Sequence, residues 1–340
     1  MNILLTGGAG YIGSHVALSL IDKGYKVHII DNLSTGNIKL IPKNASFTNC
    51  NINDEKQIAQ IVKTNNFDIL MHFAGYIQVE ESVENPDKYF ENNTNNSITL
   101  FQICKNNDLN NIIFSSTAAA YGELNTDNLI NENCILNPQN PYAESKIKTE
   151  NYLINNISEF NYIILRYFNV AGADTKMRAG QMSKQSTHLI KILSEVIVGK
   201  KDLIEIFGND YSTKDGTAIR DYIHVSDLAN IHIETAKYLL NNNESNIFNC
   251  GYGKGYSVQE VIDCAKKLYK NKINFKYSKN LKNAILTIKD DIKKDKKEKT
   301  ILFSPAAASF DQFKNFEHRG RYFNLLIKKA NFYGKQKLLR

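Results

Sequence analysis

Cysteine is scarce in this 340-residue chain, and histidine is scattered. The cysteines are odd in number and contain no close pair, which excludes both a disulfide framework and a zinc knuckle. They are Cys50, Cys104, Cys134, Cys250 and Cys264. His224 and His232 are eight positions apart and the other histidines stand alone, so none has the close second ligand that a metal site needs. The sequence predicts no metal site.

The chain also lacks long apolar runs. Hydrophobic residues make up 42% of it, enough for a sizeable core, but no stretch reaches the length of a membrane span. Residues 1–12 lack the basic start and cleavage site of a signal peptide. We therefore expect a cytoplasmic protein without membrane contact. Its length exceeds what one compact core usually serves, so two domains are expected.

Positive charge is in excess but is not concentrated. The formal net charge is +7, yet the lysines are densest only at 289–299, where Asp and Glu are mixed with them. Such a run is typical of a solvated helix face or a junction, not of a nucleic-acid site. No phosphate loop of the form Gly-x-x-x-x-Gly-Lys-Ser/Thr occurs. We expect neither a nucleic-acid partner nor ATP chemistry.

What the chain does contain is a glycine-rich turn, GGAGYIG at 7–13. The apolar run before it, 1–6, predicts a buried strand, and the pattern at 14–23 predicts a helix. Gly7 permits the tight turn, Gly10 admits a pyrophosphate close to the backbone, and Gly13 lets helix and strand pack together. The helix N-terminus would supply N–H groups to the anion.

The next predicted strand, 26–30, ends in Asp31. A carboxylate at this distance downstream accepts hydrogen bonds from the hydroxyls of an adenosine ribose. Asn32 and Leu33 follow, so no arginine is at hand for a ribose 2′-phosphate. NAD is therefore favoured over NADP. The alternative is a glycine-rich turn without a ligand.

Apolar runs and helical patterns alternate through the first half of the chain, at 67–73, 98–106, 111–116, 144–157 and 162–167. This alternation predicts a Rossmann-type, doubly wound parallel sheet, in which ligands lie at the carboxyl ends of the strands. Polar or small residues follow those ends at Ala74, Ser115 and Asn169.

Tyr142 and Lys146 lie one helical turn apart on the same predicted helix face. A cation beside a phenol favours the phenolate, so Tyr142 is a candidate base near neutral pH. The hydroxyl of Thr117 stands at a strand end. The alternative is an exposed Tyr and Lys on an ordinary helix, which the upstream cofactor motif disfavours.

From residue 1 to about 276 the chain resembles the UDP-glucose 4-epimerases of the extended short-chain dehydrogenase/reductase family. The resemblance rests on the glycine loop, on Tyr142 and Lys146, and on further motifs in the same order and spacing. These are HFAG at 72–75, FSST at 114–117, LRYFN at 165–169, IFGNDY at 206–211 and DGTAIRDYIHV at 215–225.

The resemblance implies an isomerase with NAD bound through turnover, a UDP-hexose substrate and a homodimer. Tyr142 would take the proton of the sugar 4-hydroxyl while hydride leaves C4, and the 4-keto sugar would turn over and receive the hydride on its other face. Thr117 would relay the proton, and Lys146 would hold the nicotinamide ribose and polarise Tyr142.

The same resemblance assigns the binding positions. Those implied to contact NAD are Gly7, Gly10, Tyr11, Ile12, Gly13, Asp31, Asn32, Asn51, Ile52, Phe73, Ala74, Gly75, Asn92, Ser115, Tyr142, Lys146 and Tyr167. Those implied to contact the UDP-hexose are Thr117, Asn169, His188 and Arg220.

Some positions depart from related patterns. Sugar 4,6-dehydratases need an acid and a base after the Thr117 position, where this chain has Ala118 and Ala119, so dehydration is not expected. Asn51 replaces an aspartate usual near the adenine, and Ile77 replaces a lysine found in many members near the nicotinamide. Either change could loosen the cofactor without removing the chemistry.

The C-terminal part breaks the pattern. The chain has no tryptophan and lacks the basic segment after Tyr277 that clamps the UDP pyrophosphate in the family. Instead, SPAAASFDQFKNFEHRG at 304–320 resembles the C-terminal domain of UDP-N-acetylmuramoyl-alanine:D-glutamate ligase, in which positions matching Ser309 and Phe316 contact the amino-acid substrate. The alternative is that these phenylalanines simply pack on a core.

We therefore expect three parts. Residues 1–172 and 217–252 form the NAD-binding domain, 173–216 and 253–280 a smaller and incomplete UDP-sugar-binding domain, and 281–340 a foreign, ligase-like α/β tail. The main function predicted is a UDP-hexose 4-epimerase. A catalytically weak NAD-binding remnant and a peptidoglycan ligase component remain as alternatives.

Overall fold

A computed structural model of the chain describes residues 1–122, 129–183, 188–207, 211–269, 275–278, 282–283, 285–286, 289, 321–322, 325–327 and 329. The chain forms two compact units. The first contains residues 1–185 and 221–254, and the second contains residues 186–220 and those from Gly255 onward. The ligase-like motif predicted at 304–320 lies outside the described residues, and so do Ser309 and Phe316.

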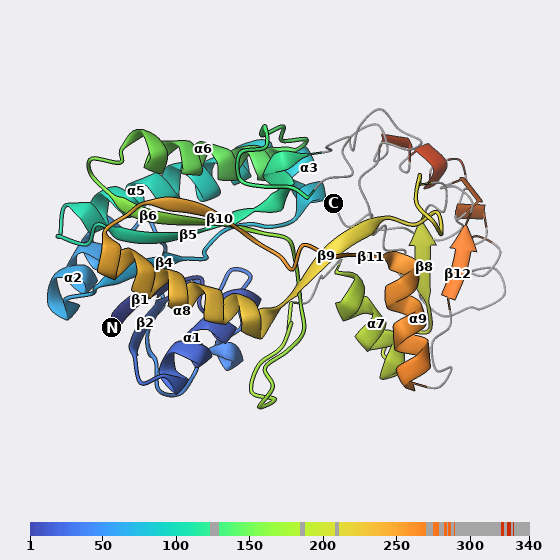
Figure 1. Cartoon of the computed structure of the whole chain (residues 1–340), viewed down its shortest axis with the longest axis horizontal. Coiled ribbons are helices and arrows are strands. Elements are labelled where there is room, and N and C mark those ends of the chain that lie inside the picture. The colour runs from blue at the N-terminus through green and yellow to red at the C-terminus, as the bar shows by residue number, and fades with distance from the viewer. Residues whose placement is uncertain are drawn as a thin grey trace. The chain divides into compact units, whose positions relative to one another are not determined.

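The first unit is built on a seven-stranded sheet in the order β10-β6-β5-β4-β1-β2-β3 (Figure 1). All its strand pairs are parallel. The strands are β1 Asn2–Thr6, β2 Lys26–Ile30, β3 Ser46–Thr48, β4 Ile69–His72, β5 Asn111–Thr117, β6 Asn161–Tyr167 and β10 Asn246–Cys250. Reading outward from β1, the order reverses direction between β1 and β4, which is the topological switch point of a doubly wound sheet. The predicted Rossmann-type, doubly wound parallel sheet is confirmed.

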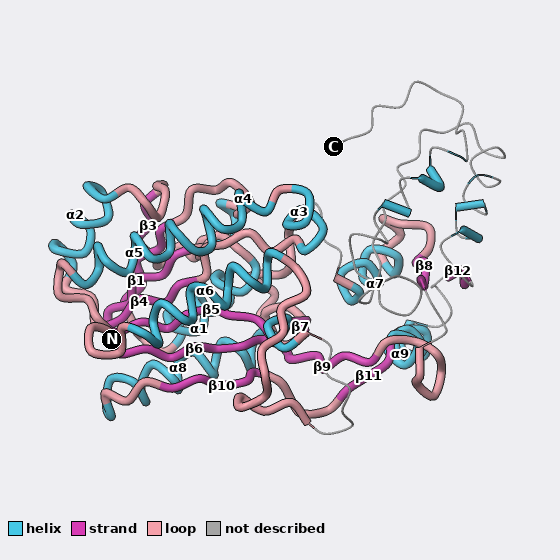
Figure 2. Tube along the Cα trace, turned by 90° about the horizontal axis from the view of Figure 1, so that it is seen from above, coloured by secondary structure: helices cyan, strands magenta, loops and turns pink. Residues whose placement is uncertain are grey.

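Helices cover both faces of this sheet. α1 and α8 lie on one face, and α2, α5 and α6 lie on the other (Figures 1 and 2). Their bounds are α1 Tyr11–Asp22, α2 Glu55–Asn65, α5 Asn96–Lys105, α6 Pro141–Asn155 and α8 Val225–Asn242. Shorter elements are η1 Ile38–Leu40, α3 Val79–Glu84, α4 Pro86–Tyr89, the π-helix η2 Phe90–Asn95 and η3 Ala118–Tyr121. A short strand β7 Asn169–Ala171 pairs in parallel with β9 Ile219–His224.

The alternation of side chains along each strand divides the core into two layers. Ile3 and Leu5 of β1 pack with α1 and α8, whereas Leu4 packs with residues of α2 and α5 on the opposite face. Because both faces are covered, three successive residues of β1 and of β4 are apolar, as the continuous runs in the sequence indicated.

The predicted strands at 26–30 and 111–116 match β2 and β5 closely, whereas two helix starts differ. α1 begins at Tyr11, three residues before the prediction, because its N-cap is Gly10 inside the glycine loop. α6 begins at Pro141, where Asn140 accepts a hydrogen bond from the backbone N–H of Ala143 and proline occupies the first turn. The start of α6 therefore depends on a local cap and that of α1 on the glycine loop, and neither depends on the apolar pattern.

The second unit has its own small core, formed by Leu193, Val196, Ile204, Ile206, Val258 and Ile262. Its elements are α7 Leu189–Ile197, β8 Ile204–Phe207, β11 Gly255–Ser257, α9 Val258–Tyr269 and β12 Phe275–Ser278. Strands β8 and β12 pair in parallel. Within this unit, Asp215 accepts hydrogen bonds from the backbone N–H and hydroxyl of Thr217.

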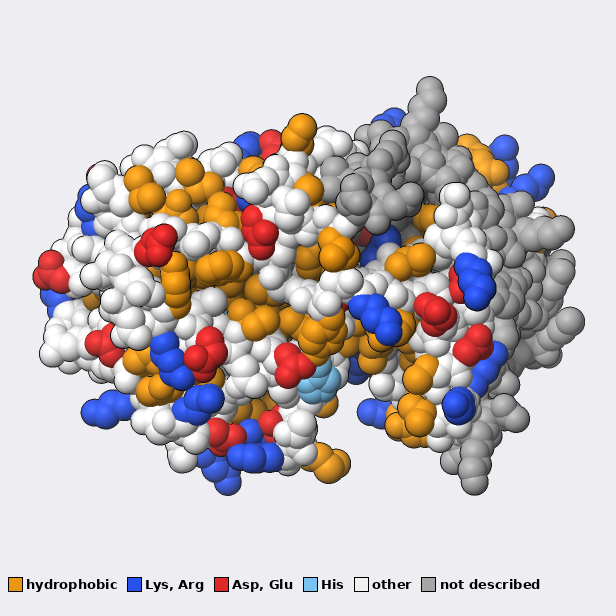
Figure 3. Space-filling model, in the orientation of Figure 1, with side chains coloured by type: hydrophobic (Ala, Val, Ile, Leu, Met, Phe, Trp, Pro, Cys, Tyr) orange, Lys and Arg blue, Asp and Glu red, His pale blue; other side chains and the backbone are white. Residues whose placement is uncertain are grey.

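The surface charges of the first unit are mixed. On the face seen in Figure 3, basic and acidic side chains lie interspersed over this unit. Several form ion pairs, for example Asp22 with both Lys176 and Arg178 at 2.8 Å. In the part of the chain that the structure describes, no helix has the length and apolar character needed to cross a membrane.

Candidate functional site

In the glycine loop between β1 and α1, two positions have so little space that only glycine fits. Gly7 has φ +73°, and a Cβ there would lie 2.6 Å from the backbone nitrogen of Ala74. A Cβ on Gly13 would lie 2.4 Å from the carbonyl oxygen of Gly7. A Cβ on Gly10 would meet only that same oxygen, at 3.1 Å. Gly7 and Gly13 are therefore required by packing, whereas a Cβ on Gly10 would make one tight contact with a backbone oxygen.

Gly10 is the N-cap of α1. No side chain caps this end of the helix, and its first turn carries no acidic residue. The macrodipole and the free N–H groups of such an end attract an anion. Tyr11, in the same turn, donates its hydroxyl hydrogen bond to the carbonyl of Gly172 at 2.6 Å. The turn can thus receive a pyrophosphate.

Asp31 follows β2 and is buried beside the glycine loop. Its two carboxylate oxygens accept hydrogen bonds from the backbone N–H groups of Ala9, at 3.0 Å, and Leu33, at 2.8 Å. Burial raises the pKa of Asp31, and these two hydrogen bonds oppose the rise. A carboxylate offers about four acceptor positions, so Asp31 retains capacity for two ribose hydroxyls. The residues present therefore fit an adenosine dinucleotide.

Thr117 and Tyr142 meet where β5 ends and α6 begins. The Thr117 side chain caps η3 by accepting from the backbone N–H of Ala119 at 3.1 Å, and it also hydrogen-bonds Tyr142. Burial raises the pKa of Tyr142, and the hydrogen bond with Thr117 lowers it in part. Desolvation of the phenolate therefore dominates the pKa of Tyr142, and the polarisation of Tyr142 by Lys146 stays a prediction.

Lys146 is buried one turn further along α6. Its ammonium donates to the carbonyl oxygen of Ser115 at 2.9 Å and lies 4.9 Å from the centre of the Phe114 ring. A Cβ on Gly75 would lie 3.4 Å from this ammonium, so the absence of a side chain at Gly75 leaves space beside it. Burial lowers the pKa of Lys146 to about 8, while the charge of Glu150 acts to raise it.

A chain of buried hydrogen bonds starts at Ser115. The Ser115 hydroxyl lies 2.7 Å from the hydroxyl of Tyr167, which lies 2.6 Å from Nε2 of His232. Nδ1 of His232 is 2.8 Å from the carbonyl of Leu228, so it carries the proton, and Nε2 accepts from Tyr167. Burial lowers the pKa of His232 to about 4, which keeps this imidazole neutral. No local pattern in the sequence indicates this role for His232, because its partners are remote in sequence.

The π-helix η2 brings Asn93, and not only the predicted Asn92, toward the site. The Asn93 side chain is buried and bonds both backbone groups of Tyr76, accepting at 2.8 Å and donating at 2.9 Å. Asn92 donates to Asn93 at 3.0 Å. π-helical turns are frequent at functional sites, but no periodicity in the sequence indicated this one.

The remaining predicted positions are distributed as follows. Asn32 and Asn51, at the ends of β2 and β3, are exposed and bond each other at 2.8 Å through their side chains. Ile52 is buried with Ile58 in one core layer. Ile12, in the first turn of α1, is partly buried against the other core layer. Phe73 packs on His232, with ring centres 4.8 Å apart.

The four predicted UDP-hexose positions fall in both units. Thr117 and Asn169, the latter exposed on β7, are in the first unit. His188 and Arg220 are half-buried and belong to the second unit. Arg220 donates to its neighbouring carbonyl, that of Ile219, at 2.7 Å. Burial lowers the pKa of His188. Among the described residues, no group of three or more metal-ligating side chains is placed to hold an ion.

Comparison with known proteins agrees with this geometry. Residues 3–251 match the model of the NAD dependent epimerase/dehydratase family. The chain is 44% identical over 262 residues to a UDP-glucose 4-epimerase of Azospirillum brasilense, covering 76% of this chain and 75% of that protein. It is 35% identical over 309 residues to one of Bacillus subtilis, covering 88% and 91%.

A solved structure extends the likeness to three dimensions. The crystal structure of a UDP-glucose 4-epimerase from Brucella ovis in complex with NAD is 35% identical, with a TM-score of 0.78, covering 82% of this chain and 86% of that one. The chain with this glycine loop, buried Asp31 and helix carrying Tyr142 and Lys146 thus matches epimerases both in sequence and in fold. The chain belongs to the UDP-glucose 4-epimerase family, within the NAD-dependent epimerase/dehydratases.

Proposed function

We propose that this protein binds NAD and interconverts UDP-glucose and UDP-galactose by transient oxidation at C4 of the sugar. The observation that carries the proposal is the arrangement of Thr117, Tyr142 and Lys146 at the carboxyl end of β5. The same unit contains the sterically constrained glycine loop. It also contains the buried Asp31, whose carboxylate can accept further hydrogen bonds. Ligands of doubly wound sheets bind at this edge.

The residues present support specific roles. Asp31 would accept the adenosine ribose hydroxyls, and the N-terminus of α1 would hold the pyrophosphate. Bound NAD supplies a hydride acceptor and a positively charged ring, which favours a nearby phenolate. Tyr142 would then remove the proton from the sugar 4-hydroxyl, with Thr117 relaying it and Lys146 adding positive charge.

The first prediction concerns the cofactor. We expect the purified protein to carry NAD, detected by mass spectrometry or nicotinamide absorbance after denaturation. Asp31→Ala should weaken NAD binding by about 1 to 3 kcal/mol, because ribose hydroxyls would lose charged acceptors. Asp31→Asn, which keeps one oxygen, should lose less. Full NAD occupancy with unchanged affinity in Asp31→Ala would remove Asp31 from the site.

The C-terminal segment forms a second part of the proposal. We propose that residues 281–340 derive from a ligase C-terminal domain and do not replace the basic segment that clamps the UDP pyrophosphate in the family. The motif at 304–320 supports this origin. The match to the Bacillus subtilis enzyme covers 88% of the chain and so extends into this segment, which supports instead an epimerase-like beginning of the tail.

A graft distinguishes these possibilities. With an epimerase-type end joined after Tyr277, the apparent affinity for UDP-glucose should improve roughly ten- to a hundredfold. This is the value of about 1.5 to 3 kcal/mol for a charge-assisted contact to phosphate. Initial rates of UDP-glucose and UDP-galactose interconversion, at limiting and saturating substrate, provide the measurement. Equal efficiency of the natural and grafted chains would show that the natural tail already serves as the clamp.

The predicted domains also receive proposed roles. We propose that residues 1–172 and 217–252 hold NAD and that residues 173–216 and 253–280 contribute to binding the UDP-sugar. His188 would be among their contacts, and Arg220 of the first set of ranges would add another. A homodimer stays a prediction from the family resemblance, and a cytoplasmic location stays a prediction from the sequence composition. The catalytically weak remnant considered as an alternative is not favoured, because the residues proposed for catalysis are all present in the first unit.

A further inference from the structure

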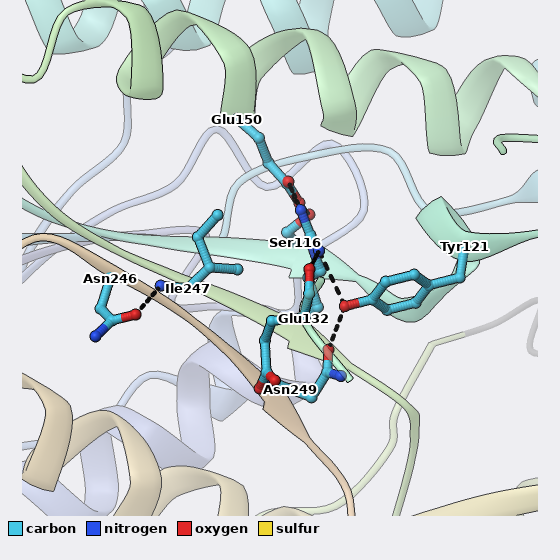
Figure 4. Close-up of polar contacts among 8 residues, drawn as sticks. Ser116, Tyr121, Glu132, Glu150, Asn246, Ile247 and Asn249 are labelled. Carbon is cyan, nitrogen blue, oxygen red and sulfur yellow. Dashed lines mark hydrogen bonds and ion pairs between the residues drawn. The ribbon is translucent and has the colours of Figure 1, made fainter. Parts of the chain in front are cut away.

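A fully buried ion pair joins β6 to α6, the helix that carries the proposed catalytic residues Tyr142 and Lys146. Arg166 of β6 donates from Nη2 to the Glu150 carboxylate of α6 at 2.6 Å, and its Nε lies 3.2 Å from both carboxylate oxygens. The side chains are 3% and 0% exposed, respectively. Figure 4 shows Glu150 pointing from its helix toward Ser116 of β5. Charges this deeply buried are tolerated only when their hydrogen-bonding capacity is satisfied.

The network around the pair satisfies that requirement. The Ser116 hydroxyl donates to the Glu150 carboxylate. On the other side, Nη1 of Arg166 donates to the Tyr121 hydroxyl at 2.9 Å, which donates to Oδ1 of Asn249 at 2.7 Å (Figure 4). The pair thus connects α6, β5, β6, η3 and β10 within the first unit.

Two features connect Glu150 to the proposed active site. It follows Lys146 by one turn of α6, so the two side chains share a helix face. Its hydrogen-bond donor Ser116 stands between Ser115, whose carbonyl binds Lys146, and Thr117, which bonds Tyr142. One carboxylate therefore anchors the strand end from which both contacts extend.

The surroundings of Lys146 leave Glu150 as the anion that acts on it. Phe114 of β5 contributes an uncharged ring. Burial raises the pKa of Tyr142 of α6, which favours its neutral phenol form. His72 of β4 is neutral because burial, reinforced by Lys146, lowers its pKa to about 3. Burial lowers the pKa of Lys146 itself to about 8, and Glu150 opposes that effect.

We propose that Glu150, held by Arg166 and Ser116, is a positioning residue that keeps Lys146 charged and fixes the end of β5 for the epimerase reaction. The inference rests on the proposed function, in which a cationic Lys146 assists Tyr142. The buried pair then sets part of the pH range over which the enzyme is active, in addition to stabilising the fold.

The test is the pH dependence of turnover in Glu150→Gln. Without the carboxylate charge, Lys146 should lose its proton at lower pH, by about one unit or more. Since activity falls as pH rises through the pKa of Lys146, the alkaline limb should move toward lower pH by that amount. At pH 8 this means a loss of turnover, with partial recovery at pH 6.5. An alkaline limb at the wild-type position would overturn the proposal.

Two further variants separate charge from structure. Ser116→Ala removes a hydrogen bond to the same carboxylate but keeps its charge, so stability should fall while the alkaline limb stays in place. Glu150→Gln combined with Arg166→Gln leaves no unpaired buried charge, which protects folding if Glu150→Gln alone is unstable. Because Arg166→Gln also removes the cation paired with Glu150, the double variant should shift the limb less than Glu150→Gln alone. A folded Glu150→Gln variant whose alkaline limb lies at the wild-type position would show that the pair is only structural.

A direct titration distinguishes this proposal from the proposed function. The Lys146 amine can be followed by heteronuclear NMR of lysine-labelled protein, with Lys146→Arg assigning the signal. A lower pKa in Glu150→Gln together with no epimerase activity in any variant would support the electrostatic link and refute the function. An active enzyme with an unchanged Lys146 pKa would refute the link alone.

Discussion

Tyr142→Phe is expected to lower epimerase turnover by at least about a hundredfold, the usual contribution of a positioned acid or base. The substitution removes the one hydroxyl that Thr117 contacts at the start of α6 and leaves the ring packed against Tyr89, 6.5 Å away. NAD should remain bound, since Asp31 and the glycine loop are untouched. Steady-state rates of UDP-glucose and UDP-galactose interconversion, with NAD content measured on the same samples, test this.

Matched variants on the same elements make the result specific. Tyr152→Phe removes a hydroxyl from the same helix on the side that packs in the core, and its turnover should equal that of the wild type. Thr117→Val should reduce turnover less than Tyr142→Phe, because it removes a relay hydroxyl and not the base. A Tyr142→Phe enzyme that keeps its rate would move the base to another residue.

Gly13→Ala and Gly10→Ala are expected to fail in different ways. A Cβ on Gly13 would lie 2.4 Å from the backbone oxygen of Gly7, which cannot move without opening the turn. Gly13→Ala should therefore cost about 1 to 3 kcal/mol of stability through overpacking and also abolish NAD binding. A Cβ on Gly10 would make one tight contact, at 3.1 Å from the same oxygen, so Gly10→Ala should lose much less stability than Gly13→Ala.

The informative contrast is between stability and cofactor affinity. For Gly10→Ala, we expect the denaturation midpoint of the NAD-free protein to change little, while NAD affinity falls because the methyl group enters the space reserved for the pyrophosphate. Denaturant unfolding and calorimetric titration of NAD-stripped protein measure the two quantities separately. Undiminished NAD affinity in Gly10→Ala would place the pyrophosphate away from this turn.

Much of this protein was determined locally by its sequence. The apolar runs at 1–6 and 26–30 and the intervening glycines specify strand, turn and helix through interactions between near neighbours. The alternation of such units is enough to predict a doubly wound sheet, because parallel strands need helical crossovers. Tyr142 and Lys146 are on the same helix, as their spacing indicated. Helix starts were less accurate where a cap, as at Asn140, decided them.

The tertiary structure alone decided the environment of those residues. His232 joins Tyr167, and Glu150 joins Arg166, across 65 and 16 sequence positions. Neither pairing has a local pattern, since each forms only when separate strands and helices pack. The same is true of pKa values: four-residue spacing suggested a phenol influenced by a cation, but burial raises the pKa of Tyr142. Desolvation depends on everything that surrounds a group, and short-range sequence order does not contain that information.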